Sequence, residues 1–208
     1  MKLKDMTVEQ FTQTLASDAP APGGGSASAV AGAMGIALGQ MVAKLTLGKK
    51  KYLEFDENSR KVIEEAESVI SEMIQGIDTD TDAFNLVSSA YAMPKETDEE
   101  KKARSAAIQD GLKECARVPF ELVLRCEKAL CILMPLLGKF NTNCASDLGV
   151  GALNLRSAAL GAWLNVLINV GSLKDTELAE KYKSEGKRAV DNICKMADEI
   201  YEHAIGLM

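Results

Sequence analysis

Three aspartates have the spacing and chemistry of a candidate acid/base centre. Asp78, Asp80 and Asp82 are two residues apart, so on a helix their side chains fan around the axis and cannot share one face. Two interpretations fit. They are a solvated helix start whose carboxylates favour the positive end of the helix dipole, or a group in which one carboxyl points inward with a raised pKa suited to proton transfer. The spacing alone leaves both open.

Polar side chains also gather in the second half of the chain. Asn143, Ser146 and Asp147 lead directly into an apolar stretch, and Asn165 and Asn169 follow within it. These last two are one helical turn apart, so both side chains face the same way. Because a buried amide must be hydrogen-bonded, the pair predicts either hydrogen bonding between helices or a polar ligand pocket.

A glycine-rich turn precedes a long uncharged stretch, in the order Pro22, Gly23, Gly24, Gly25 and Ser26. We expect Ser26 to cap a helix whose first N–H groups, being unpaired, favour an anion. The motif lacks the preceding strand of a dinucleotide fingerprint and the terminal Gly-Lys-Ser/Thr of a P-loop. Ligand binding and a plain turn at a helix start both remain open.

Composition excludes several classes of site. A net charge of −6 and 5% aromatic residues argue against a nucleic-acid surface. Five cysteines without a C-x-x-C pair indicate reduced thiols in a cytoplasmic protein, rather than disulfides or a zinc site. The single histidine, His203, lies near the end of the chain, and we expect it to be a surface or packing residue.

One stretch requires a test for membrane insertion. Residues 26–43 carry no charge and contain Gly35 and Gly39 at a spacing common in packed transmembrane helices. However, the stretch is mostly Ala, Gly and Ser, whereas a membrane span needs about 20 strongly apolar residues. We therefore expect a buried helix whose small residues let neighbouring backbones approach, and no membrane partner.

The elements that would position these residues are all predicted to be helices. Thr7 with Gln10, and Thr97 with Glu100, have the spacing of capping boxes, and residues 57–77 form an amphipathic pattern. Further helices are expected over 26–47, from Ala83 to Pro94, over 144–170, and from a cap at Asp175 or Thr176 to the C-terminus, with Pro119 and Pro135 starting or kinking others. Since no alternating strand pattern occurs, we predict an all-α bundle of six to nine helices, one domain spanning 1–208.

Several motifs along the chain, taken together, resemble the folate cyclodeaminase/cyclohydrolase family. They are residues 19–26, 41–46, 80–84, 93–95, 143–148 and 165–169, in the same order and across essentially the whole chain. The resemblance implies a tetrahydrofolate one-carbon enzyme with an antiparallel helix bundle and helix-mediated dimerisation. It also implies no metal and no cofactor beyond the tetrahydrofolate substrate.

The activity implied first is that of a methenyltetrahydrofolate cyclohydrolase, which converts 5,10-methenyl- to 10-formyl-tetrahydrofolate. The alternative is a formimidoyltetrahydrofolate cyclodeaminase, which releases ammonia and forms 5,10-methenyltetrahydrofolate. Both reactions need a positioned acid/base and correct orientation of the substrate. A non-catalytic folate-binding module and a structural helical oligomer remain the rival hypotheses.

The resemblance also implies roles for individual residues. Asp80 is the first choice for acid/base catalysis and Asp147 the second. Glutamate carboxylates of the folate, one or several, would contact the glycine-rich helix start and a lysine cluster, and amides would bind the pterin. The implied substrate-binding residues are Pro22, Gly23, Gly24, Gly25, Ser26, Lys49, Lys50, Lys51, Asn143, Ser146, Asn165 and Asn169. The implied partners are the folate and a second copy in a homodimer, with no nucleic acid.

Overall fold

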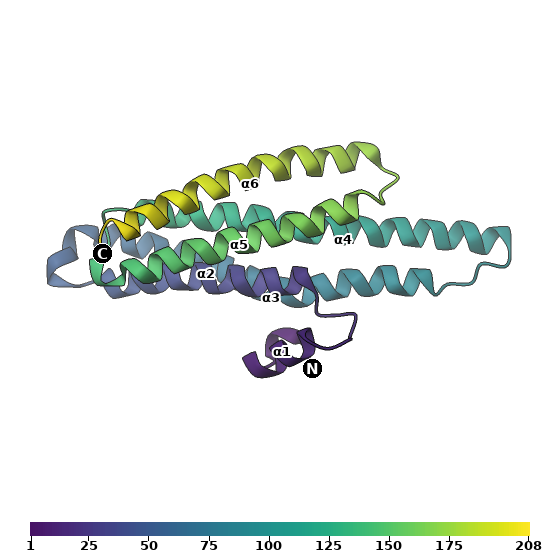
Figure 1. The fold of residues 1–208 in the computed structure, drawn as a ribbon, viewed down its shortest axis with the longest axis horizontal. Helices are drawn as coiled ribbons and strands as arrows, with labels where there is room; N and C mark the ends of the chain where they lie inside the picture. Colours follow the sequence, from purple (N-terminus) through teal and green to yellow (C-terminus); the bar gives the residue numbers. More distant parts are fainter.

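The chain folds into an elongated bundle of α-helices (Figure 1). The computed structural model describes all residues 1–208, and it contains no strand. The α-helices are α1 (Val8–Leu15), α2 (Gly24–Thr46), α3 (Asp56–Tyr91), α4 (Asp98–Leu133), α5 (Ala145–Val170) and α6 (Thr176–Ile205). Short 3-10 helices are η1 (Leu3–Asp5), η2 (Lys50–Phe55), η3 (Met134–Leu136) and η4 (Thr142–Cys144). From α2 to α6 the long helices alternate in direction, so the predicted antiparallel all-α bundle is confirmed.

Local sequence signals explain where several helices begin. Thr7 accepts from the Gln10 N–H and Gln10 bonds back to Thr7, which completes the capping box of α1. Thr97 and Glu100 do the same for α4. Asp175 caps α6 by accepting from the N–H of Leu178. These predicted starts are therefore confirmed.

The centre of the bundle depends on small residues in α2 and α5. A Cβ atom added at Gly35 would lie 2.8 Å from the Gly151 carbonyl oxygen, so the two helices cross with their backbones in contact. By length and composition α2 is the one helix that could span a membrane, but 56% of its apolar window is buried inside the protein. The expectation of a buried helix with close backbone contacts is confirmed.

Three predicted boundaries are wrong. The helix after the glycine turn begins at Gly24 with Gly23 as its N-cap, because the Ser26 side chain bonds to another helix instead. Asp78, Asp80 and Asp82 lie inside α3, which runs without interruption through this region, rather than at a new helix start. Pro119, which was predicted to start or kink a helix, lies inside one continuous helix, α4, so it does not start one. In each case tertiary contacts outweigh the local preference, which is weak for the Ser26 cap and strong for Pro119.

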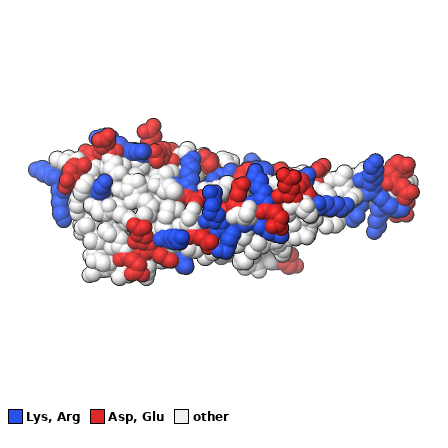
Figure 2. Space-filling view, turned by 90° about the horizontal axis from the view of Figure 1, so that it is seen from above, with Lys and Arg blue, Asp and Glu red and all other residues white.

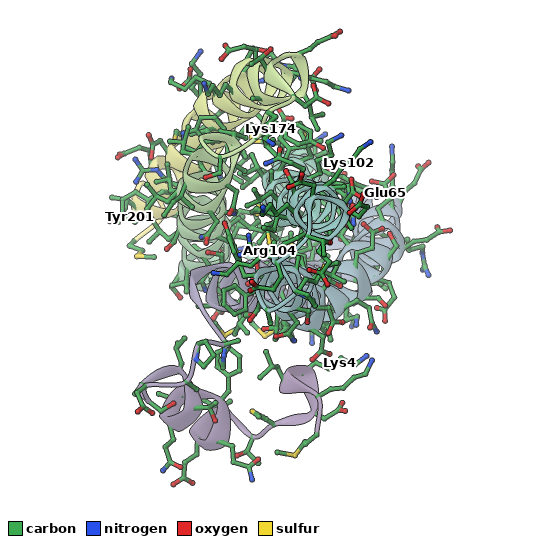
Figure 3. All side chains as sticks on the ribbon, turned by 90° about the vertical axis from the view of Figure 1, so that its right-hand side faces the viewer. Lys4, Glu65, Lys102, Arg104, Lys174 and Tyr201 are labelled. Atoms are coloured by element: carbon green, nitrogen blue, oxygen red, sulfur yellow. The ribbon has the colours of Figure 1, made fainter.

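The chain extends beyond the bundle at two places. The first is α1, which has no buried residue and stands away from the other helices (Figures 1 and 3). Phe11 of α1 packs against the core of the bundle, and Lys4 of the preceding η1 donates to the Gln75 side chain at 2.7 Å. The second is the α3–α4 hairpin, whose tip projects past α5 and α6. Figure 2 shows acidic and basic side chains together at this tip, with no large area of one sign.

Candidate active site

The centre of the candidate site is a carboxylate held against the first turn of α2. The Ser26 N–H donates to Asp80 Oδ2 at 3.0 Å, and the Ser26 hydroxyl lies 3.3 Å from the same oxygen. That hydroxyl also donates to the Ile77 carbonyl at 2.8 Å, which joins α2 to α3. A Cβ atom at Gly25 would overlap the Asp80 carboxylate, so only glycine permits this approach. The α2 start therefore binds an anion that belongs to the protein itself.

Two opposing effects act on the Asp80 carboxyl. Burial raises its pKa above the ordinary value, and the hydrogen bonds from Ser26 oppose that rise without cancelling it. The side chain remains partly accessible from the cavity beside it. A raised pKa at an accessible carboxyl is what proton transfer near neutral pH requires.

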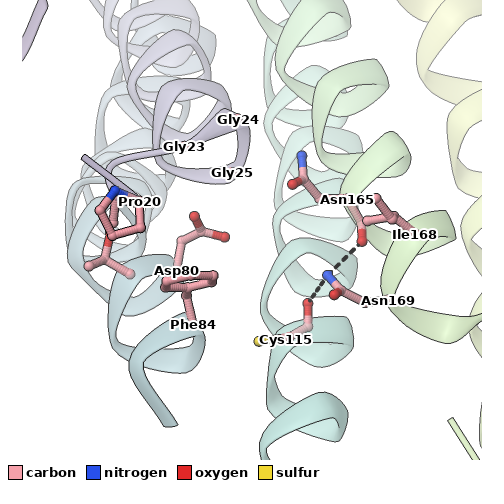
Figure 4. Close-up of a pocket in the computed structure, with 12 residues that line it drawn as sticks. Pro20, Gly23, Gly24, Gly25, Asp80, Phe84, Cys115, Asn165, Ile168 and Asn169 are labelled. Atoms are coloured by element: carbon pink, nitrogen blue, oxygen red, sulfur yellow. Dashed lines mark hydrogen bonds between the residues drawn. The ribbon is translucent and has the colours of Figure 1, made fainter. Parts of the chain in front are cut away.

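The opposite wall of the site comes from α5 (Figure 4). Asn165 Nδ2 donates to the Gly161 carbonyl at 2.9 Å. Asn169 Nδ2 donates to two carbonyl oxygens, of Cys115 at 2.9 Å and of Asn165 at 2.8 Å. The Oδ1 atoms of both amides have no hydrogen-bond partner within the chain. The predicted hydrogen bonding between helices is confirmed for Asn169 alone, because the Asn165 bond stays within α5. Both residues line the cavity, and the predicted binding of a ligand by them stays a prediction.

Between the two walls lies a cavity of about 160 Å³. It brings together residues that are far apart in the sequence: Pro20, Ala21, Gly23, Gly24, Gly25, Asp80, Thr81, Phe84, Cys115, Asn165, Ile168 and Asn169. The predicted glycine turn, the aspartate and the asparagine pair thus share one pocket. Pro22 and Ser26 lie in the same turn without lining the cavity.

Several lining residues were not identified from the sequence as site residues. Phe84 and Ile168 present apolar surface to the cavity, with 40% and 75% of their area exposed. Burial and the nearby charge of Asp80 raise the pKa of the Cys115 thiol to about 11, so it stays protonated at neutral pH. The sequence holds one signal for Cys115, which lies four residues before Pro119. If both lie in one helix, the Cys115 carbonyl has no helical donor and can bind another group.

The remaining predicted site residues lie at the other end of the bundle. Asn141 donates its N–H to Thr46, at the end of α2. Its neighbour Asn143 lies in η4, and Ser146 and Asp147 lie in the first turn of α5. Since α2 rises about 1.5 Å per residue, this end is about 30 Å from Gly25. The lysines of the predicted cluster, Lys49, Lys50 and Lys51, follow α2 at the same end. The expectation of one pocket for all these residues is wrong within a single chain, because α2 and α5 separate them by their full lengths.

The other two aspartates of α3 have different surroundings. Asp78 is buried and accepts from the N–H of Leu3 at 2.7 Å, so it fastens the N-terminal segment. Asp82 is exposed. The three side chains point in different directions, as the spacing predicted. Asp78 holds the N-terminal segment, Asp80 lines the cavity and Asp82 lies on the surface.

The single histidine lies outside the cavity. His203 accepts the Gly138 N–H at 3.2 Å and packs near the Phe140 ring, in agreement with the expected packing role.

Comparison with known proteins gives a consistent result. The family model described as formiminotransferase-cyclodeaminase matches residues 7–188. A methenyltetrahydrofolate cyclohydrolase from Methylorubrum extorquens is 40% identical over 196 residues, which are 94% of each chain. A formimidoyltransferase-cyclodeaminase from Gallus gallus is 35% identical over 91% of this chain, which corresponds to 34% of that longer protein.

A solved structure is similar over the whole fold. The crystal structure of a formiminotetrahydrofolate cyclodeaminase from Thermotoga maritima aligns with a TM-score of 0.81 and 25% identity. The alignment covers 99% of this chain and 97% of that one. The helical arrangement described above is therefore shared with a protein of known structure.

Proposed function

Because this chain belongs to the formiminotransferase-cyclodeaminase family, we propose that it is a tetrahydrofolate one-carbon enzyme, and specifically a methenyltetrahydrofolate cyclohydrolase. The observation that carries the specific activity is the 40% identity to a methenyltetrahydrofolate cyclohydrolase over 94% of both chains. The pocket supports it, since a carboxyl with a raised pKa lies beside two free amide oxygens.

In the proposed reaction Asp80 is the acid/base. Water adds to the carbon that bridges N5 and N10 of 5,10-methenyltetrahydrofolate, and the Asp80 carboxylate takes a proton from the attacking water. The neutral adduct then breaks its bond to N5, Asp80 gives the proton to N5, and the hydroxyl proton leaves to solvent. The product is 10-formyltetrahydrofolate, and one proton is released overall.

The rest of the pocket suits the charge and shape of this substrate. The bridging carbon of the methenyl form is cationic, and the free Oδ1 atoms of Asn165 and Asn169 are hydrogen-bond acceptors that favour positive charge or N–H donors. Phe84 and Ile168 offer apolar contact to a flat ring. The proposal uses no metal and no cofactor beyond the folate.

A cyclodeaminase reaction is the second candidate, favoured by the structural similarity to the Thermotoga maritima cyclodeaminase. There N10 attacks the formimino carbon and ammonia leaves, and the same carboxyl would move the protons. The demands on Asp80 and on the two amides are the same, so the residues of the pocket do not discriminate between the reactions.

Two assays with purified protein separate these functions. With 5,10-methenyltetrahydrofolate, a cyclohydrolase removes the methenyl absorbance faster than buffer does. With 5-formimidoyltetrahydrofolate, a cyclodeaminase creates that absorbance and releases ammonia. Absence of both changes would reject the catalytic proposal. In that case, a rise in Tm on addition of folate would support a non-catalytic binding module. An unchanged Tm would support a structural oligomer.

We also propose that the protein works as a homodimer in the cytoplasm, formed through α5 and the adjacent face of α2. Exposed apolar side chains lie along α5 at intervals of three, seven, four and three residues: Val150, Leu153, Leu160, Leu164 and Leu167. Such spacing suits packing against another helix. In a dimer with a two-fold axis, the stripe of one chain would pack against the same stripe of the other. Ser157 lies between Leu153 and Leu160 in this stripe, and its neighbour Arg156 pairs with Asp198 of α6 at 3.6 Å.

An antiparallel pair would bring different ends of the two chains together. The Asn143–Asp147 end of one chain would then lie beside the Ile168 end of the other. A cavity of about 160 Å³ is smaller than the roughly 300–1,000 Å³ of most ligand pockets, so a second chain would enlarge and enclose it. Glutamates that leave the pocket of one chain would run towards Lys49, Lys50 and Lys51 of the other.

A further inference from the structure

Pro119 occupies an unusual position, in the interior of a continuous α-helix. It is buried within α4, which runs from Asp98 to Leu133. In an α-helix each N–H donates to the carbonyl four residues earlier. Proline has no N–H, and its ring also presses against that carbonyl. The carbonyl deprived of its helical partner here is that of Cys115.

The Cys115 carbonyl has found a replacement donor in the candidate site. Asn169 Nδ2, from α5, donates to it at 2.9 Å (Figure 4). The second hydrogen of the same nitrogen goes to the Asn165 carbonyl at 2.8 Å. Both hydrogens of the amide are therefore used on acceptors that cannot donate. This pattern determines which end of the amide is nitrogen and leaves Oδ1 as its free atom.

We infer that Pro119 is a positioning residue for Asn169. Because Pro119 has no N–H, the Cys115 carbonyl accepts from Asn169 Nδ2 instead. This bond orients the Asn169 amide so that its Oδ1 stays free as an acceptor in the pocket. The link connects α4 to a side chain of α5 with no contact between Pro119 and the ligand. The effect on turnover rests on the proposed function, whereas the hydrogen-bond geometry does not.

A double-mutant cycle tests whether Pro119 acts through Asn169. Pro119→Ala restores the N–H, and we expect kcat/KM for methenyltetrahydrofolate to fall about tenfold, the equivalent of one hydrogen bond of about 1.4 kcal/mol. In the Asn169→Ala background the same change should have no further effect, since the amide is gone. An equal fall in both backgrounds, or no fall in either, would overturn the inference.

A matched control addresses the buried volume that the substitution removes. Pro119 also borders a small cavity behind Asp80, together with Val118. Val118→Ala removes buried volume from the same wall without adding an N–H. The effects of Val118→Ala and Asn169→Ala on kcat/KM should therefore be additive, with no coupling between the two substitutions. If Val118→Ala couples to Asn169 as strongly as Pro119→Ala does, packing rather than the missing N–H is responsible, and the inference fails.

A crystal structure of Pro119→Ala supplies a readout that needs no folate. We expect the restored N–H to donate to the Cys115 carbonyl and the Asn169 nitrogen to move out of hydrogen-bond distance of it. A structure in which the Asn169–Cys115 bond persists would reject the inference. If the wild-type protein turns over neither folate, the proposed function fails, but this comparison still decides whether Pro119 orients Asn169.

Discussion

At the scale of single residues, the site depends on the close approach of Gly25, Ser26 and Asp80. The helix start that looked suited to an external anion already holds Asp80 through the Ser26 N–H. The N–H groups of Gly24 and Gly25 make no backbone hydrogen bond, so they are the donors that remain for a ligand at this turn. The protein thus combines an internal carboxylate with open backbone donors.

Adjacent glycines of the turn provide a matched pair of variants. A Cβ atom at Gly25 would overlap the Asp80 carboxylate, whereas one at Gly23 would have nothing within 4 Å. We expect Gly25→Ala to displace the carboxylate and to lower kcat about 100-fold, as small misplacements of catalytic groups do. Gly23→Ala adds a methyl group to the cavity wall without touching the carboxylate, so it should lower kcat much less than Gly25→Ala does. Similar rates for both variants in the methenyl assay would contradict this account.

The raised pKa of Asp80 predicts how stability changes with pH. Because burial raises the pKa in the folded state, the folded protein binds this proton more tightly than the unfolded chain does. The contribution is complete below the unfolded pKa and is lost as pH rises through the folded pKa. We therefore expect Asp80→Asn, which keeps the acceptor for Ser26, to gain Tm relative to wild type as pH rises from about 4 to 7. A Tm difference that is independent of pH would refute the assignment.

Some residues of the candidate site could be predicted from the sequence, and others could not. The Asn165/Asn169 pair was identified because a helix places residues four apart on one face. The spacing of the three aspartates did not choose among them, and Asp80 was chosen through the family resemblance. Asp147 and Lys49–Lys51 were grouped with them because spacing along the chain carries no information on which helix ends meet. Cys115 and Phe84 became visible as site residues only with the helix packing.

At the scale of elements, α3 carries two carboxylates with different contacts within one helical turn. Asp80 faces the pocket, while Asp78 accepts the N–H of Leu3 and fastens the N-terminal segment. An apolar cavity of about 380 Å³ separates α1 from α2 behind this tether. The segment continues to Pro20 and Ala21, which line the cavity of the candidate site.

The tether can be tested by hydrogen exchange. We expect Asp78→Ala to accelerate amide exchange over residues 1–15, because a buried bond that holds η1 is lost. Asp82→Ala, at an exposed position of the same helix, serves as the control and should leave exchange in this segment unchanged. Equal exchange in Asp78→Ala and wild type would show that other contacts hold the segment.

Element types were predictable, but continuity was not. Capping boxes and apolar periodicity located most helices, because both signals act within one or two turns. The chain passes without a break through Asp78–Asp82 and Pro119. At those places side chains of other helices bond to the backbone: Ser26 donates to the Ile77 carbonyl, and Asn169 donates to the Cys115 carbonyl. No local sequence pattern indicates these partners.

At the scale of the whole molecule, the apolar stripe on α5 predicts self-association. Leu164 is 67% exposed within this stripe, and Leu86 is 55% exposed on the α3–α4 hairpin. We expect Leu164→Glu to lower the molar mass measured by light scattering from that of a dimer to that of a monomer, because it places charge in the interface. Leu86→Glu, on another surface, should remain dimeric. A wild-type monomer, or a dimer in both variants, would contradict the proposed interface.

The central claim is that Asp80 transfers the proton in the folate reaction. Its most direct test is the rate of methenyl absorbance loss for wild type, Asp80→Asn and Asp82→Asn, with folding checked by circular dichroism. We predict that Asp80→Asn loses about 10²- to 10⁴-fold in kcat, the range for removal of a general acid/base, while Asp82→Asn matches wild type. A folded Asp80→Asn protein with wild-type turnover would contradict the claim.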